Sequence, residues 1–152
     1  MIIDSHAHLD FPAFVPDREM VLARARQQGV AAIINVGINM AANRLSLALA
    51  GAHAGVYAAV GVHPNEAGRM PDDDWGGLAE MAAGARVVAI GETGLDFYRR
   101  GASPEQQMAA FRRQLDLAAE LGRPVIIHGR QADKEVLETL TSWVAATPAP
   151  AG

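Results

Sequence analysis

The sequence contains no cysteine and no long apolar run, and both absences limit what the protein can be. Without cysteine the chain has no disulfide and no thiolate metal site, which leaves histidine, aspartate and glutamate as ligands for a metal ion. No apolar stretch approaches the roughly 18 residues of a membrane-spanning helix, and the N-terminus lacks the basic and apolar regions of a signal peptide. We therefore expect a cytoplasmic protein that does not interact with membranes.

An excess of basic residues is also missing. The chain has 13 Lys and Arg against 17 Asp and Glu, which gives a formal net charge of −4. Proteins that hold nucleic acid by charge alone usually present a basic face, so this composition argues against that mode of binding. Half of the 152 residues are apolar, which is enough for the core of one globular unit or of part of one.

Short apolar runs alternate along the chain with longer stretches of helical spacing. Such runs are typical of buried parallel strands, and the alternation fits either a doubly wound open sheet or a (β/α)8 barrel. No glycine-rich nucleotide-binding motif follows any of the runs, which removes the strongest reason to choose the open sheet. The predicted strands lie near residues 2–6, 31–36, 56–62, 87–91 and 124–128.

Histidine or carboxylate side chains follow four of these predicted strands, at the point where each apolar run ends. Ligand-type side chains at several strand ends favour the barrel, because α/β barrels place their chemistry at the C-terminal rim of the strands. The chain holds only about five βα units, whereas a closed barrel has eight units and about 250 residues. We expect an α/β, TIM-barrel-type fold truncated to about its first five units. The side chains at the strand ends are His6, His8, His63, Glu92 and His128.

Residues 1–152 are predicted to form a single incomplete barrel domain. The fifth helix should run from Asp133 to about Ala146, and residues 146–152 then have the proline and glycine content of a loop between a helix and a strand. A sixth strand is the element expected next, so we interpret the chain as the N-terminal part of a longer protein. The alternative is a native minimal domain with a flexible tail.

The His6-Ala7-His8 triplet is a candidate metal-binding pair. Successive side chains of a strand point to opposite faces, so both imidazoles share one face with Cα atoms roughly 6.5 Å apart. That spacing lets both rings reach one metal ion. The alternative is a pair of histidines whose nitrogens are hydrogen-bonded within the protein.

Glu92 follows an apolar strand and needs a positive partner. Burying an unpaired carboxylate is unfavourable, so we expect a metal ion or a proton beside it. An ion pair with an arginine such as Arg130 is the structural alternative. His128 ends the next strand and should reach the same space, unless it is a core histidine with both nitrogens hydrogen-bonded.

The arginines occur in groups, and two of them are candidate substrate contacts. Arg112 and Arg113 are expected to lie on a solvated helix face, which is the ordinary place for grouped charges. Arg99 and Arg130 instead follow predicted strand ends at the rim, and we interpret them as candidate contacts for a phosphate group.

The same residues carry a resemblance to a known family. The most specific stretch is Ala-Ile-Gly-Glu-Thr-Gly-Leu-Asp-Phe-Tyr-Arg at 89–99, and the segments 3–11, 61–64, 114–115 and 124–128 also match. From its first residue to about residue 140, the sequence resembles the TatD family of metal-dependent hydrolases.

The resemblance implies a (β/α)8 barrel of the amidohydrolase type that hydrolyses phosphodiester bonds, typically as an exonuclease-like deoxyribonuclease on DNA. It implies up to two divalent cations, Mg, Mn or Zn, which activate a water for attack on phosphorus. His6 and His8 are then expected to bind the first metal, Glu92 to bridge the two, and His128 to bind the second. His63 is expected to act beside Glu92 in catalysis by meeting the phosphate or the leaving group.

The chain departs from the family pattern in two respects. The family often has a second histidine shortly after His63, where this chain has Asn65. A histidine expected after the sixth strand and an aspartate expected after the eighth have no counterpart here. We therefore expect one metal at His6, His8 and Glu92, a second site that is weak or empty, and impaired phosphodiesterase activity, little or none in this chain.

Other functions remain open alternatives at this point. The first is an inactive truncated remnant or a partner-dependent module. The second is a hydrolase of another ester or amide bond, because one fold and ligand set permits many chemistries. No stable partner is evident, and the free edge of the strand near 124–128 predicts self-association.

Overall fold

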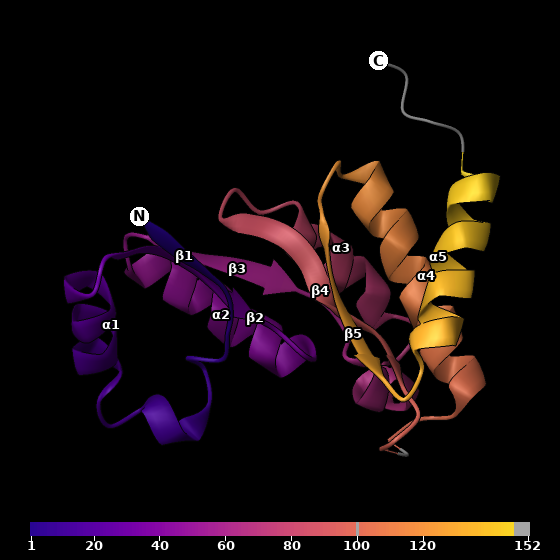
Figure 1. The fold of residues 1–152 in the computed structure, drawn as a ribbon, viewed down its shortest axis with the longest axis horizontal. Coiled ribbons are helices and arrows are strands. Elements are labelled where there is room, and N and C mark those ends of the chain that lie inside the picture. Colours follow the sequence, from indigo (N-terminus) through magenta and orange to yellow (C-terminus); the bar gives the residue numbers. More distant parts are fainter. Residues whose placement is uncertain (100, 148–152) are drawn as a thin grey trace.

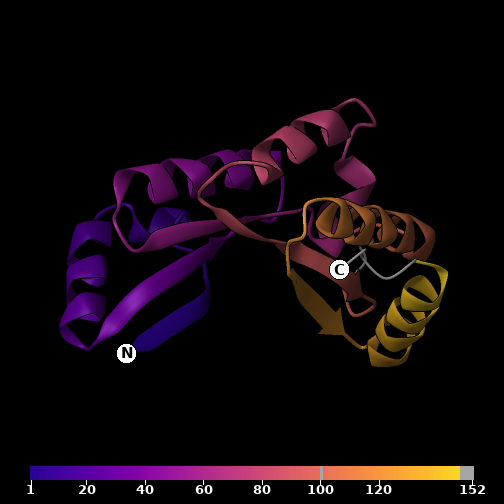
Figure 2. The ribbon, with the colours of Figure 1, turned by 90° about the horizontal axis from the view of Figure 1, so that it is seen from above.

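The computed structural model describes residues 1–99 and 101–147, and in that part of the chain five parallel strands form one curled sheet. The strands lie in sequence order, β1-β2-β3-β4-β5, and neighbouring strands are parallel. Every connection therefore runs from the C-terminal end of one strand to the N-terminal end of the next. Figure 2 shows the helices along the outer side of the curve, with β1 and β5 at its two ends. The predicted α/β fold, a barrel cut to about five units, is confirmed.

The observed elements follow the predicted alternation of strand and helix (Figure 1). The fifth helix has the predicted bounds, and of the predicted tail at 146–152 the residues 148–152 lie outside the described part. The strands are β1 (Ile2–Ala7), β2 (Val30–Val36), β3 (Val56–Val60), β4 (Val87–Asp96) and β5 (Val125–Arg130). The helices are α1 (Arg18–Gln27), α2 (Met40–Ala52), α3 (Asp74–Ala82), α4 (Pro104–Glu120) and α5 (Asp133–Ala146), with short 3-10 helices η1 (Pro12–Phe14) and η2 (Pro64–Arg69).

β4 is longer than the sequence predicted. The apolar run indicated a strand over 87–91, but the strand continues to Asp96 and pairs with β5 from Thr93 to Asp96. Gly91 (φ +148°) and Gly94 (φ +130°) make this pairing possible. A Cβ on Gly91 would lie 2.6 Å from the carbonyl oxygen of Ile126, and a Cβ on Gly94 would overlap the carbonyl oxygen of His128. The two glycines therefore let β5 approach β4 closely.

The helices follow from local sequence signals, most clearly in α4. The Ser103 side chain accepts the amide of Gln106, the Gln106 side chain accepts the amide of Ser103, and Pro104 occupies the first turn. This capping box satisfies amides that the first turn would otherwise leave unpaired. None of the described helices combines the length and the apolar character that crossing a membrane requires.

The core lies between the outer face of the sheet and the helices that cover it. Val60 and Ile90 from the sheet and Leu78 from α3 are fully buried in the largest cluster. Phe111 and Leu95 fill a second cluster between α4, β4 and α5. Each such side chain contributes about 1.5–3 kcal/mol through burial. This packing holds the strands so that their C-terminal ends face one another.

The two edge strands of the sheet, β1 and β5, carry apolar side chains that the described residues leave uncovered. β1 and β5 each pair with one neighbour among the described strands. Ile2 and Ile3 in β1 are 54% and 57% exposed, and Ile127 in β5 is 36% exposed. Strands of a closed α/β barrel are buried on both faces. In the described part of the chain these strand side chains therefore lack the cover that a closed barrel would give them.

Replacing Phe111 by alanine should lower the free energy of unfolding by about 3–5 kcal/mol, because the side chain is fully buried and its removal leaves a cavity. Leu137→Ala is the matched control. That side chain is 64% exposed, so the expected change is below about 0.5 kcal/mol. Urea denaturation followed by circular dichroism measures both values, and equal effects would contradict this assignment of the core.

Candidate metal centre

The C-terminal ends of the strands surround a cavity of about 400 Å³. Two imidazoles come from the end of β1, one from the segment after β3, a carboxylate from β4 and an imidazole from β5. The candidate site residues predicted from the sequence thus all line one cavity, although they are far apart along the chain. They are His6, His8, His63, Glu92, Arg99, His128 and Arg130.

The first cluster consists of His6, His8 and Glu92, whose ligand atoms lie within 4.8 Å of one another. Oε2 of Glu92 lies 3.5 Å from Nε2 of His6 and 3.9 Å from Nε2 of His8. Nδ1 of His8 lies 2.9 Å from the carbonyl oxygen of Val36, and it carries the proton because a carbonyl only accepts. Nε2 of neutral His8, which lies 3.3 Å from Nε2 of His6, therefore carries a lone pair that can accept a hydrogen bond from that ring or bind a metal ion.

The second cluster shares Glu92 and adds His63 and His128. Nδ1 of His128 lies 2.9 Å from Oε1 of Glu92. The ring centroids of His63 and His128 are 4.4 Å apart, with the two planes at 63°. Glu92 therefore offers one carboxylate oxygen to each cluster, which is the arrangement that a bridging ligand requires.

His63 is oriented by the backbone that follows it. Its Nδ1 accepts a hydrogen bond from the amide of Asn65 at 3.1 Å. Burial of the ring lowers the pKa of His63, and the negative charge of Glu92 opposes this only in part. A neutral ring that accepts at Nδ1 carries its proton on Nε2. His63 is therefore better suited to donate a hydrogen bond into the cavity than to bind a metal.

The charge of Glu92 bears on what the cavity holds. Glu92 is buried, and its ion-pair partners among the described residues are all histidines. The alternative pairing with Arg130 does not occur, since that guanidinium lies over the Tyr98 ring, 3.9 Å from its centroid. A buried carboxylate among imidazoles is stabilised by a cation, and this set of N and O donors suits zinc, manganese and, less well, magnesium. The residues fit divalent cations.

Asp96 is a site residue that the sequence analysis did not single out. Its side chain is 1% exposed, and its Oδ2 lies 2.9 Å from Nδ2 of Asn65 and 3.3 Å from Nε2 of His128. Burial raises the pKa of the Asp96 carboxyl, but hydrogen bonds from the Arg99 amide and the Asn65 side chain outweigh burial and lower it. Glu92 and Asp96 share one face of β4, and this spacing could have identified Asp96 from the sequence. It was overlooked because the strand was predicted to end at residue 91.

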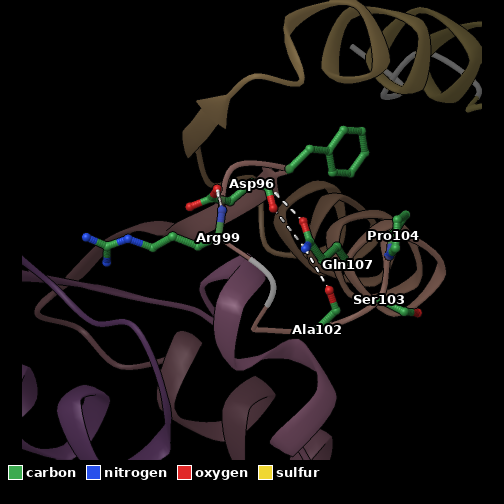
Figure 3. Close-up of a pocket in the computed structure, with 7 residues that line it drawn as sticks. Asp96, Arg99, Ala102, Ser103, Pro104 and Gln107 are labelled. Carbon is green, nitrogen blue, oxygen red and sulfur yellow. Dashed lines mark hydrogen bonds between the residues drawn. The ribbon is translucent and has the colours of Figure 1, made fainter.

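A neighbouring cavity of about 460 Å³ borders Asp96 on the side of α4 (Figure 3). Gln107 of α4 accepts the Asp96 amide at 2.8 Å and donates to the Asp96 carbonyl at 3.1 Å. Arg99 lines both cavities, and in Figure 3 its side chain extends away from Gln107. The two hydrogen bonds from Gln107 hold the end of β4, and thereby Asp96, in place.

Two further carboxamides hold the segment that leads to His63. Asn43 of α2 bonds both the amide and the carbonyl of Gly61, at 3.1 and 3.0 Å. Gln114 of α4 does the same for Val62, at 2.8 and 3.1 Å. Each amide side chain supplies a donor and an acceptor to a residue that follows the end of β3. The sequence analysis named Gln114 only within the family resemblance and gave it no role.

β2 has no predicted site residue, yet its Asn35 positions the loop that follows His8. Asn35 is fully buried, and its side-chain oxygen accepts the amide of Leu9. Its side-chain nitrogen donates to Asp10 at 2.9 Å and to Ser46 at 2.7 Å. The available signal was that Asn35 is a polar residue near the end of an apolar run. Asparagine was not among the ligand types expected at a metal site, so Asn35 was not predicted.

The comparison with protein families decides the family. A family model described as TatD related DNase matches residues 3–149. The chain belongs to the TatD family. The resemblance carried by the stretch at 89–99 is thereby confirmed.

Two relatives of this chain in the TatD family are named 3'-5' ssDNA/RNA exonuclease TatD. The protein from Pectobacterium parmentieri is 40% identical over 149 residues, and that from Enterobacter lignolyticus is 37% identical over 147 residues. The matches cover 97% of this chain but 57% and 56% of the relatives. The chain thus spans little more than half the length of these relatives.

Solved structures of TatD proteins have the same fold. YJJV, a TatD homologue from Escherichia coli K12, is 35% identical with a TM-score of 0.85, over 93% of this chain and 56% of that protein. A TatD family hydrolase from Entamoeba histolytica, 21% identical, superposes with a TM-score of 0.88 over 95% of this chain and 55% of its own. The five βα units correspond to part of a larger TatD fold.

Asn35→Ala should speed hydrogen exchange at the Leu9 amide, because that amide loses its buried acceptor, and lower the free energy of unfolding by about 1–3 kcal/mol. Asn39→Ala is the matched control, since Asn39 caps α2 by accepting the Ala42 amide. It should lower the stability of α2 without a specific effect at Leu9. Hydrogen exchange measured by NMR separates the two effects, and an unchanged rate at Leu9 in Asn35→Ala would refute the role of Asn35.

Proposed function

We propose that this chain is the metal-binding part of a TatD-type phosphodiesterase that hydrolyses DNA from its ends. The observation that carries the proposal is the meeting of His6, His8, Glu92 and His128 at one cavity. The names of the relatives, 3'-5' ssDNA/RNA exonuclease, support a single-stranded nucleic acid as substrate. A cytoplasmic location is part of the same proposal, because nucleic acid substrates are met there.

We propose up to two divalent cations, of magnesium, manganese or zinc, as cofactors. His6, His8 and Glu92 would hold the first, and three protein ligands are the number typical of a catalytic site with an open position. Glu92 and His128 would hold the second. When bound, such cations lower the pKa of a water and neutralise the charge that develops on the phosphoryl oxygens.

The remaining residues of the cavity act on the substrate. Hydrolysis joins a water oxygen to phosphorus and breaks the bond from phosphorus to the leaving oxygen, which takes up a proton. His63 is suited to meet the phosphate or leaving oxygen, because its Nε2–H is a donor while its Nδ1 is occupied by the Asn65 amide. Arg99 and Arg130 supply positive charge for the phosphate, and Arg130 is steadied by the Tyr98 ring.

The extent of the chain limits the activity that we propose for it. Residues 1–152 are proposed to be a single incomplete barrel domain, since the matches cover 56% and 57% of the relatives. By the family pattern, further ligands would follow a sixth and an eighth strand. The exposed Ile2, Ile3 and Ile127 favour a second candidate, a module that self-associates or takes up the missing strands from a partner. A hydrolase of another ester or amide is not favoured by any particular contact.

Glu92→Gln should weaken zinc binding by at least about tenfold, because it removes the negative charge and one of the two carboxylate oxygens that Glu92 offers to the two clusters. Glu138→Gln, an exposed carboxylate on α5, is the control and should bind as the unaltered chain does. Isothermal titration calorimetry with zinc alone measures both affinities. The same affinity in both variants would rule out a metal centre at Glu92.

The chain alone should cleave a single-stranded oligodeoxynucleotide with manganese at least roughly a hundredfold more slowly than the intact Pectobacterium parmentieri relative, because ligands are missing. Addition of the C-terminal remainder of that relative should raise the rate if the open strand edges accept it. A chain as active as the intact relative would contradict the incomplete site. No gain on complementation would favour the inactive remnant.

A further inference from the structure

His128 lies between two carboxylates, and this arrangement constrains which of its nitrogens can bind a metal. Nδ1 is 2.9 Å from Oε1 of Glu92, and Nε2 is 3.3 Å from Oδ2 of Asp96. An ionised carboxylate only accepts hydrogen bonds, whereas a neutral imidazole has one N–H and one lone pair. A metal ion beside Glu92 would take the lone pair at Nδ1, and the single proton would then sit on Nε2 and point to Asp96.

Asp96 itself has no oxygen left over for a metal. Its Oδ1 accepts the amides of Tyr98 and Arg99 at 3.0 and 2.7 Å. Its Oδ2 accepts from Asn65 and faces His128. The two clusters of metal-binding geometry contain Glu92 but not Asp96. The carboxylate is therefore held as a hydrogen-bond acceptor.

The position of Asp96 is determined from both sides. Gln107 bonds its backbone amide and carbonyl, and the side chain is 1% exposed. On the other side Asn65, which is itself tied to the Gly101 amide, donates to Oδ2 at 2.9 Å. A fixed acceptor of this kind orients a histidine more strongly than a mobile one does, since it cannot follow a rotation of the ring.

We propose that Asp96 is a positioning residue that, anchored by Asn65, holds the Nε2–H of His128 and so presents the Nδ1 lone pair to a divalent cation beside Glu92. This inference rests on the metal centre of the proposed function. Carboxylates that hold a metal-binding histidine typically change metal affinity by about 10- to 100-fold when removed. Asn65 thereby acts on the metal site indirectly, because it anchors the carboxylate that orients His128.

The test exchanges the two side chains, as Asn65→Asp together with Asp96→Asn. The exchange keeps the net charge, the hydrogen bond between positions 65 and 96, and an oxygen for the amides of Tyr98 and Arg99. It places an NH₂ group opposite Nε2 of His128, which must then accept, and the proton moves to Nδ1. Zinc affinity at His128 should fall by about 10- to 100-fold.

Long-range ¹H–¹⁵N NMR spectra of the 152-residue chain, titrated with zinc alone, report the state of each His128 nitrogen. In the unaltered chain we expect zinc on Nδ1 and the proton on Nε2. Zinc on Nε2, or equal zinc affinity in the exchanged variant, would overturn the role of Asp96 and leave the metal centre intact. Absence of zinc from His128 while His6 and His8 bind it would overturn the role of Asp96 and leave the first metal site intact, whereas absence of zinc from all three histidines would overturn both proposals.

A second variant keeps the test decisive if the exchanged chain unfolds. Asn65→Ala leaves Asp96 in place but removes its anchor, so zinc affinity at His128 should fall by less than about tenfold. Circular dichroism and the amide resonances of Tyr98 and Arg99 monitor the fold. An Asn65→Ala variant with unchanged zinc affinity would contradict the proposed anchoring.

Discussion

The carboxylate of Glu92 is the group on which the rest of the site depends. It is buried, one oxygen faces His6 and His8, and the other faces His128. Its ion-pair partners among the described residues are histidines, and no arginine or lysine of the described part is paired with it. Because a buried charge without compensation is unfavourable, a cation held between these side chains would stabilise the ionised carboxylate.

The backbone at the strand ends around the cavity is held by polar side chains that are not themselves candidate metal ligands. Asn43, Gln114 and Gln107 each bond an amide and a carbonyl of one residue at a strand end. Side chains from helices on the outer face of the sheet thereby fix the backbone at the strand ends that surround the cavity. The geometry of the site therefore depends on how the helices pack against the sheet.

The sequence allowed the fold and most of the site to be predicted, for reasons that are local. Apolar runs indicated the strands, and parallel strands bring the residues that follow them to the same edge, which placed His6, Glu92 and His128 together. Asn35 and Asp96 were missed, because a buried amide or carboxylate is recognised by its partners. Some of those partners lie far away in the chain, as Leu9 does for Asn35, so the local signals of Asn35 and Asp96 did not show which groups these side chains bond.

The sequential strand order has a consequence for how the molecule is assembled. Each strand pairs with the strand that precedes it, so the sheet can grow from β1 as the chain leaves the ribosome, without waiting for distant segments. The cavity is different, since His6 and His8 are synthesised first but meet Glu92 only when β4 has docked. During synthesis part of the sheet can therefore form before the cluster of His6, His8 and Glu92 is complete. Until β4 has docked, His6 and His8 lack their carboxylate partner.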